Sequence, residues 1–314
     1  MNITDPIFHD EAKAAAHIER SRWPTGEVTC PLCGADRIRR MGGKTQAGMF
    51  LCNDCRGKFT LRTGTVMERS HVPLHKWMLA MHLMAASKKG MSAKQMERML
   101  GVTYKTAWFL CHRIREAMDG AAGNDPMGGT PGAIVEADEA FIGGKQGNRA
   151  YRKVGPKKVV FTLVERGGHA RSFHVANVHA NTLRSVLVQN VARSANLATD
   201  KAAHYVNTGF EFRTHGAVNH GEREYAKTET RPGLWAGVSG RWHTNTVENF
   251  FSIFKRGVIG TYHHVSEAHI HRYTREFDMR YNTREMSDGE RAALILKGAE
   301  GRRLTYRRPH AVAA

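Results

Sequence analysis

The spacing of apolar residues predicts that residues 66–119 are helical. Apolar side chains recur every three or four positions over residues 74–84, after a proline that suits the first position of a helix. A capping-box sequence, residues 92–95, begins a second helix. After a short turn that contains glycine, a third helix follows over about residues 103–117.

Strands mixed with helices are expected after residue 132, where the spacing of apolar residues changes. The expected strands are 134–139, 158–165, 170–176 and 196–200, and the expected helices are 181–192 and 245–255. The second and third of these strands should form a hairpin that turns at Gly167 and Gly168. Asn245 is expected to cap the last helix.

Glycine and proline mark a boundary between these two parts, because residues 120–132 have the composition of a loop. A chain of 314 residues suits two or three domains. We predict a multidomain protein of the α+β and α/β classes. Its segments are an N-terminal region with four of the cysteines (1–65), a helical domain (66–119), a linker (120–132), a mixed-sheet domain (133–300) and a basic tail (301–314).

The charge of the chain indicates a polyanionic partner. It has 47 Lys and Arg residues against 29 Asp and Glu residues, a net charge of +18. Nucleic acid is the leading candidate, since the binding of Lys and Arg to phosphates releases counterions. A soluble basic enzyme is the alternative, and a membrane surface is less favoured because the basic residues are spread along the whole chain. No apolar run is long enough for a membrane helix or a secretory signal, so we expect a cytoplasmic protein.

Two Cys-x-x-Cys pairs predict a zinc ribbon. Cys30 and Cys33 form the first pair, and Cys52 and Cys55 form the second. The segment between them is long enough for a hairpin that brings both pairs to one ion, and four thiolates suit tetrahedral Zn²⁺. Disulfides or coincidence are the alternatives. The fifth cysteine, Cys111, lies on an apolar stripe and is expected to be a buried small hydrophobic residue.

The second and third helices have the arrangement of a helix-turn-helix, which reads DNA with its second helix. The exposed start of that helix would carry Tyr104, Lys105 and Thr106, whose side chains can reach bases and phosphates. The alternative is an ordinary helical hairpin that fills a core. The net charge favours the DNA-binding interpretation.

Three acidic residues are candidates for a metal site. Asp138 lies in a predicted strand, where acidic residues are disfavoured, and Asp200 ends another. Glu248 lies on the last predicted helix. Each has an ordinary alternative: an ion pair for Asp138, a helix cap for Asp200, and a capping box with Asn245 for Glu248. Together, three carboxylates can hold two Mg²⁺ ions, which suits an in-line phosphoryl transfer.

Several basic residues outside the predicted helix-turn-helix could follow a DNA backbone. They are Lys145, Arg149 and Lys157. The arginines of the basic tail fit a solvated surface equally well. His263 and His264 lie in a loop-like stretch and favour surface positions or DNA contacts over a metal site.

The acidic motifs resemble those of the DDE transposases of insertion sequence family 1595. The resemblance is carried by VEADEAFIGGK (135–145), TD (199–200), HTNTVENFFSIFKRGVIGTYHH (243–264) and FDMRYN (277–282). It implies a catalytic domain of ribonuclease H-like fold, with Asp138, Asp200 and Glu248 as ligands of Mg²⁺ or Mn²⁺. It also implies that Lys255 grips DNA near the scissile phosphate, although a solvated helix charge is the alternative. A zinc ribbon and a helix-turn-helix belong to the same family layout.

The resemblance implies the transposase of a bacterial insertion sequence. Such an enzyme binds the terminal inverted repeats of its element, cleaves DNA strands with two metals and joins them to target DNA. We expect double-stranded DNA as the partner, no membrane, at least a dimer on DNA, and association with the nucleoid during action. The other hypotheses are a non-catalytic DNA-binding regulator and a metal-dependent nuclease without strand joining. An intact acidic triad argues against a regulator.

Overall fold

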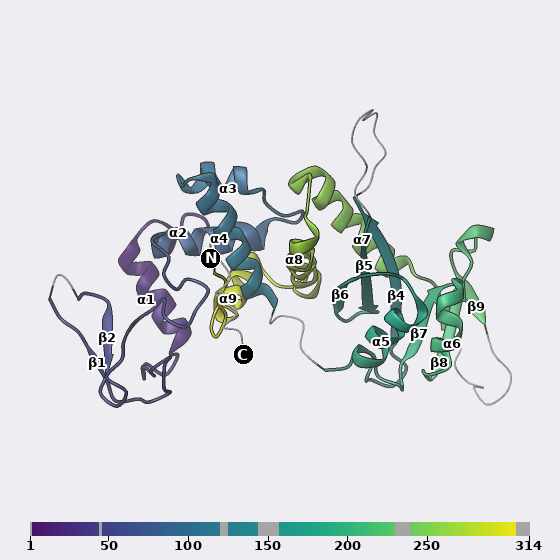
Figure 1. The fold of residues 1–314 in the computed structure, drawn as a ribbon, viewed down its shortest axis with the longest axis horizontal. Coiled ribbons are helices and arrows are strands. Elements are labelled where there is room, and N and C mark those ends of the chain that lie inside the picture. Colours follow the sequence, from purple (N-terminus) through teal and green to yellow (C-terminus); the bar gives the residue numbers. More distant parts are fainter. Residues whose placement is uncertain (1, 44–45, 120–124, 144–156, 230–239, 306–314) are drawn as a thin grey trace, which may run out of the picture. The chain divides into compact units, whose positions relative to one another are not determined.

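The computed structural model describes residues 2–43, 46–119, 125–143, 157–229 and 240–305. Contacts divide the chain into two units (Figure 1). The first unit contains residues 1–121 together with residues 283–314, and the second contains residues 122–282. No helix among the described residues combines the length and the apolar character that crossing a membrane requires.

Helices account for most of the regular secondary structure described in the first unit. They are η1 (Pro6–Phe8), α1 (Glu11–Arg22), α2 (Leu74–Ala86), α3 (Ala93–Leu100), α4 (Tyr104–Ala117) and α9 (Asp288–Lys297). The apolar spacing of α2 buries Trp77, Met78 and Met81 in the core of this unit. We expected α9 in the mixed-sheet domain, but it packs against α2 and belongs to the first unit.

The turn between α3 and α4 follows from local sequence. The Ser92 hydroxyl accepts a hydrogen bond from the Gln95 backbone N–H at 3.1 Å and so caps α3. Gly101 ends α3 with φ +60°, a left-handed conformation that favours glycine. Thr103 then caps α4 by accepting from the Thr106 N–H at 3.3 Å. The helices predicted for this segment are therefore confirmed.

A small antiparallel sheet also belongs to the first unit. Its strands β1 (Ile38–Arg40), β2 (Met49–Cys52) and β3 (Lys58–Thr60) lie in sequence order. Phe50 and Phe59 stack at a ring-centroid distance of 5.2 Å, and Trp23 meets Phe50 edge-on at 5.8 Å. These aromatic contacts give the sheet a small core of its own.

A five-stranded mixed sheet is the centre of the second unit. Its order is β6-β5-β4-β7-β8, in which β4 pairs antiparallel with β5 and parallel with β7. The strands are β4 (Ile134–Ile142), β5 (Lys158–Glu165), β6 (Ala170–Val175), β7 (Asn196–Asp200) and β8 (Thr214–Val218). The central strand β4 is longer than predicted, and it carries side chains to both faces of the sheet.

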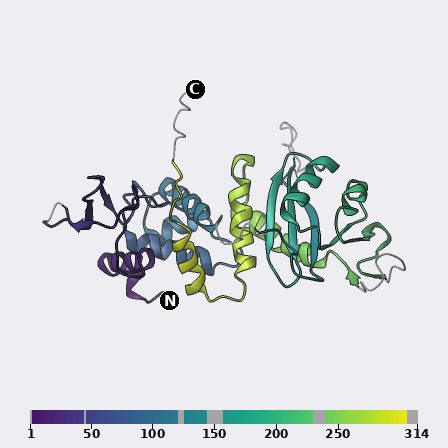
Figure 2. The same cartoon turned by 90° about the horizontal axis from the view of Figure 1, so that it is seen from below.

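Helices cover both faces of this sheet (Figures 1 and 2). On one face, α5 (Ala180–Asn190) packs Leu183 and Leu187 against β4 and β5. On the other face lie α7 (Asn245–Gly257) and α8 (Ile270–Asn282). The shorter elements are η3 (Ala203–Tyr205), α6 (Val206–Gly209), η4 (His220–Glu222), the strand pair β9 (Lys227–Glu229) and β10 (Gly240–Trp242), the π-helix η5 (Val258–Tyr262), and η6 (Glu267–His269).

The start of α7 differs from the prediction. Asn245 is the first helical residue, and Thr244 occupies the cap position. Because Asn245 lies inside the helix, it does not serve as the predicted cap. The side chain of Thr244 makes no capping hydrogen bond either, so the first N–H groups of α7 take their partners from elsewhere.

Candidate active site and metal centre

The four paired cysteines converge on one point of the ribbon. Their sulfur atoms all lie within 4.8 Å of one another. The Sγ atoms of Cys30 and Cys55 are 3.8 Å apart, and those of Cys33 and Cys52 are 3.7 Å apart. A tetrahedral zinc ion about 2.3 Å from each sulfur would require separations of about 3.8 Å. The site therefore fits Zn²⁺ with no open coordination position.

Backbone N–H groups of the second knuckle favour a thiolate at this site. Those of Cys55 and Asp54 point at the sulfur of Cys52 and lower the pKa of its thiol to about 7. Hydrogen bonds to neighbouring cysteines raise the pKa of the Cys33 thiol to about 12, so it is at Cys52 that the lowered pKa favours the zinc-binding thiolate near neutral pH. Cys111 is buried on α4 and is not part of the cluster, as predicted.

Two of the predicted acidic residues lie on neighbouring strands, Asp138 in the middle of β4 and Asp200 at the end of β7. In the parallel pair β4–β7, Glu136 is opposite Ala198. Asp138 and Asp200 each follow two residues later on their strands, so the register brings them side by side. The sheet changes from antiparallel to parallel pairing at β4. Such a switch point, at the carboxyl ends of strands, is where open α/β sheets bind ligands.

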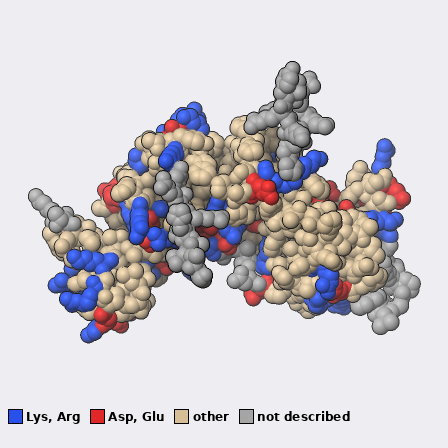
Figure 3. Space-filling view, in the orientation of Figure 1, with Lys and Arg blue, Asp and Glu red and all other residues tan. Residues whose placement is uncertain are grey.

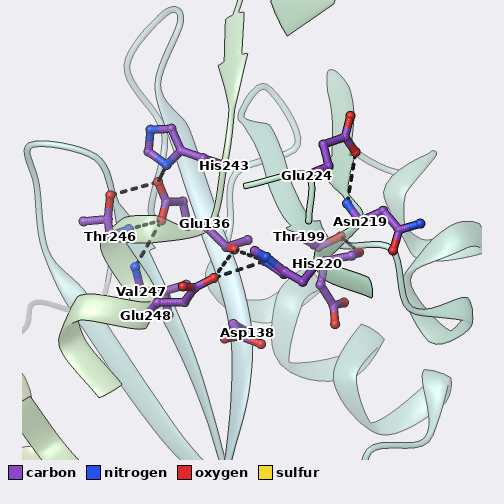
Figure 4. A network of polar contacts seen from close by, with 12 residues as sticks. Glu136, Asp138, Thr199, Asn219, His220, Glu224, His243, Thr246, Val247 and Glu248 are labelled. Carbon is purple, nitrogen blue, oxygen red and sulfur yellow. Dashed lines mark hydrogen bonds and ion pairs between the residues drawn. The ribbon is translucent and has the colours of Figure 1, made fainter. Parts of the chain in front are cut away.

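The third acidic residue reaches the same place from α7. Figure 4 shows Glu248, Asp138 and His220 close to one another, although they come from the helix α7, the strand β4 and the 3-10 helix η4. The Thr244 hydroxyl donates to Glu248 Oε1 at 2.8 Å, and His220 Nε2 lies 3.1 Å from the same oxygen. His220 also contacts the Thr244 hydroxyl at 2.9 Å. Glu248 is thus held from two sides while its side chain stays 44% exposed.

Negative charge accumulates around Asp138. Burial, together with the neighbouring carboxylates of Glu139, Asp200 and Glu248, raises the pKa of its carboxyl to about 7. Oxygen ligands with excess negative charge suit a divalent cation such as Mg²⁺. Among the described residues, these carboxylates are spaced more widely than the cysteine sulfurs, which alone form a cluster within 4.8 Å.

A further acidic residue lies beneath this cluster. Glu136 is fully buried, and its carboxylate accepts hydrogen bonds from the backbone N–H groups of Thr246 and Val247 at 2.8 and 3.0 Å (Figure 4). Arg166 Nε donates to it at 2.6 Å, and the Thr246 hydroxyl donates at 2.9 Å. Glu136 therefore belongs to the interior rather than to the open carboxylate cluster.

Comparisons with known proteins agree with this arrangement. Residues 129–282 match the model of the ISXO2-like transposase domain, and residues 9–58 match that of the transposase zinc-ribbon domain. An uncharacterized protein in transposable element ISH50 of Halobacterium salinarum is 29% identical over 312 residues, which cover 93% of this chain and 98% of that protein. The chain belongs to the DDE transposases of insertion sequence family 1595. The first matched region contains all three candidate carboxylates, and the second contains all four paired cysteines.

The basic site residues predicted for this transposase have different surroundings. Lys255 is exposed in the last turn of α7, with Nζ 5.9 Å from the centre of the Phe251 ring. Lys157 is exposed just before β5, while Lys145 and Arg149 lie outside the described residues. At the start of α4, Tyr104 and Lys105 are exposed and Thr106 is half-buried.

The sequence analysis did not single out His220 or Thr244. Both contact Glu248, but His220 follows β8 and Thr244 precedes α7. No spacing rule relates a histidine of a short 3-10 helix to another helix that begins more than twenty positions later. The tertiary contacts of Glu139 were also not predicted: it accepts a hydrogen bond from the Tyr205 hydroxyl at 2.5 Å, and His204 lies 3.3 Å away.

Proposed function

We propose that this transposase binds the terminal inverted repeats of its element and catalyses DNA cleavage and strand transfer at Asp138, Asp200 and Glu248. The observation that carries this proposal is that Asp138 in the middle of β4 lies near both Asp200, at the end of the neighbouring strand β7, and Glu248. The sheet order supports a ribonuclease H-like catalytic fold, since three antiparallel strands are followed by two parallel ones.

In this proposal the three carboxylates hold two Mg²⁺ or Mn²⁺ ions. When bound, such ions supply activation of an attacking oxygen and stabilisation of the leaving oxygen in phosphoryl transfer. Thr244 and His220 orient the Glu248 carboxylate toward the site through the contacts described above. Lys255, two turns further along α7, would bind a phosphate near the scissile bond.

DNA recognition in this proposal rests on the first unit. The pair α3–α4 would act as a helix-turn-helix, with Tyr104, Lys105 and Thr106 facing DNA. Exposed Lys and Arg side chains gather over the ribbon (Figure 3). Arg39 on β1 and Lys58 on β3 are both exposed. Together with the net charge of +18, these surfaces favour binding to the phosphate backbone. Lys157 would extend the contact from the catalytic unit.

The reaction itself indicates how many protomers act together on DNA. A transposon has two ends, and both are joined to one target, so one protomer per end is the simplest arrangement. We therefore propose at least a dimer on paired-end DNA, acting at the nucleoid. Measuring the mass of the complex on paired-end DNA tests this, and a fully active single subunit would contradict it.

Single replacements of the carboxylates test the catalytic assignment. Asp138→Asn, Asp200→Asn and Glu248→Gln keep the size of each side chain but remove a charge from the metal site. Because metal-assisted stabilisation is worth several kcal/mol in the transition state, cleavage and joining should fall roughly a hundredfold or more. DNA binding in a gel-shift assay should survive. Normal cleavage by all three variants would contradict the assignment of these carboxylates, whereas no cleavage by the wild type with any divalent metal would favour the alternative of a non-catalytic DNA-binding regulator.

Strand joining separates a transposase mechanism from that of a simple nuclease. The wild-type protein should require Mg²⁺ or Mn²⁺ to cleave element ends and should also insert those ends into a target plasmid. Cleavage without insertion under all metal conditions would favour a nuclease without strand joining.

A further inference from the structure

The carboxylate of Glu136 is fully buried in the second unit, and burying it costs desolvation free energy. A charge taken out of water destabilises the fold unless it is paired and hydrogen-bonded. Glu136 lies on the central strand β4, two residues before Asp138, and its side chain has no exposed surface. Its contacts therefore indicate what the charge does.

One carboxylate oxygen caps α7. Glu136 Oε2 accepts from the N–H groups of Thr246 and Val247, the second and third residues of the helix. These are the donors that the side chain of an N-cap residue normally binds, and a negative charge there also interacts favourably with the helix dipole. Thr244 holds the cap position but directs its hydroxyl to Glu248 instead. The capping is thus done by a residue from another element, which leaves Thr244 for Glu248.

The other carboxylate oxygen is bound by side chains. Glu136 Oε1 accepts from Arg166 Nε at 2.6 Å and from the Thr246 hydroxyl at 2.9 Å, and His243 Nδ1 lies 3.0 Å away. A second Arg166 nitrogen donates to the carbonyl oxygen of His243 at 2.9 Å. Arg166 therefore holds both Glu136 and the segment that leads into α7. With both oxygens occupied, Glu136 has no place among the metal ligands in this arrangement.

We propose that Glu136 is a positioning residue that sets the spacing of Asp138 and Glu248 by fastening the start of α7 to β4. Asp138 is two residues further on the same strand, and Glu248 directly follows Val247, whose N–H Glu136 binds. Mg²⁺ demands near-ideal ligand geometry, so a small shift of α7 against β4 would weaken the site. This inference rests on the proposed function, because it assigns Glu136 to the same carboxylate site.

Asp278 provides a control for a purely structural role. It is also a buried carboxylate, with 5% exposure, and it joins a helix to the same sheet. It accepts from the Ser172 backbone N–H at 2.8 Å and from the Ser172 hydroxyl at 2.6 Å, so it ties α8 to β6. Neither α8 nor β6 carries a residue of the carboxylate triad. If a replacement acts only by lowering the stability of the fold, variants of Glu136 and Asp278 should therefore lose metal affinity to the same degree. If Glu136 positions the site, only its variant should lose metal affinity.

The test compares Glu136→Gln with Asp278→Asn in the full-length, zinc-loaded chain. Gln keeps the shape of Glu136, but its NH₂ group faces the donor of Arg166. Mn²⁺ binding is followed by the electron paramagnetic resonance signal of free Mn²⁺, and stability is followed by thermal unfolding. The Mn²⁺ concentration for half-saturation should rise about 10–100-fold in Glu136→Gln, as for other residues that orient metal ligands. It should change less than about twofold in Asp278→Asn at an equal loss of melting temperature.

A milder variant covers the case in which Glu136→Gln does not fold. Thr246→Val removes the hydroxyl that donates to Glu136 but keeps the backbone N–H and the β-branched shape. It should raise the half-saturation concentration in the same direction by about threefold or more. Unchanged Mn²⁺ binding in Thr246→Val would then overturn the proposal.

Asp138→Asn separates failure of this inference from failure of the proposed function. If Asp138→Asn binds Mn²⁺ like the wild type, the carboxylate site itself is wrongly assigned. If Asp138→Asn loses Mn²⁺ while folded Glu136→Gln retains normal affinity, only the positioning role is overturned. Equal weakening in Glu136→Gln and Asp278→Asn would also overturn it, because both effects would then follow from stability.

Discussion

The four cysteines of this transposase come from two knuckles on one small ribbon, whereas its three candidate carboxylates come from two strands and a helix. The cysteine sulfurs lie within 4.8 Å of one another. The carboxylates are spaced more widely, and Glu248 remains 44% exposed. A closed set of four ligands suits a structural ion, while an open set leaves room for a substrate. The comparison shows how one chain builds a site for folding and a site for chemistry by different routes.

The electrostatics of the two regions also differ. In the ribbon the shifts oppose one another, because backbone N–H groups lower the pKa of Cys52 while hydrogen bonds to neighbouring cysteines raise that of Cys33 to about 12. In the catalytic unit, burial and neighbouring carboxylates disfavour the charged form of Asp138 and raise its pKa to about 7. The carboxylates therefore repel one another when no cation is present, and a bound cation would offset this repulsion, as is common at functional sites.

The largest effect should follow from removing the zinc ligands. Cys30→Ser combined with Cys52→Ser leaves two thiolates, which cannot complete a tetrahedral site, so zinc content should fall from one ion per chain to nearly none. Because metal binding and folding are coupled in small zinc modules, the ribbon should also lose its protection from proteolysis. Metal analysis and limited proteolysis measure both. Cys111→Ser is the control, and zinc retained by the double variant would contradict the assignment.

Unlike removal of the zinc ligands, removal of the Asp138 carboxylate should stabilise the fold when no divalent cation is present. A carboxyl whose pKa is raised on folding from 3.8 to about 7 destabilises the folded state once it is ionised, so this cost grows between these two pH values and is complete above about 7. Without divalent cations, Asp138→Asn should therefore unfold at a higher temperature than the wild type at pH 8, and the difference should shrink at pH 5. Thermal unfolding at both pH values checks this. An unfolding temperature of Asp138→Asn below that of the wild type at pH 8 would contradict this difference between the carboxylate site and the zinc site.

Lys255 should matter at the catalytic step. If it binds a phosphate near the scissile bond, Lys255→Ala should slow cleavage about tenfold, which corresponds to about 1.4 kcal/mol of transition-state stabilisation. DNA affinity should change little, because many other cations contribute to it. Single-turnover cleavage compared with a gel-shift assay separates the two. Arg256→Ala, an exposed charge at the next position of α7, is the control, and an equal effect in both variants would indicate only a general charge contribution.

The smallest effect is expected at the start of α4. Lys105→Ala should weaken binding to element ends by a few-fold, since one phosphate contact among many is lost. If Lys105 contacts only phosphate, the loss should be similar on all sequences and the slope of log affinity against log salt should fall by about one unit. Lys297→Ala, an exposed lysine on α9, serves as the control. Unchanged affinity for every DNA would remove Lys105 from the interface.

Local features of the sequence were enough to predict much of this protein. The two Cys-x-x-Cys pairs indicated the ribbon because each knuckle is formed by neighbouring residues. Ser92 and Gly101 predicted the bounds of α3 because caps and left-handed turns depend on local backbone chemistry. The strand β4, although it extends beyond the predicted residue 139, and the hairpin of β5 with β6 were likewise predicted from neighbouring residues.

Only the tertiary structure decided which distant residues meet. Asn245 was expected to cap α7 on local grounds, but Glu136 takes that role across the sheet, 110 positions earlier in the chain. His220 reaches Glu248, and α9 packs with the first unit, although no period or motif relates these segments. The physical reason is that periodicity records which face of an element is buried, whereas the partner of a buried polar group depends on how the elements pack.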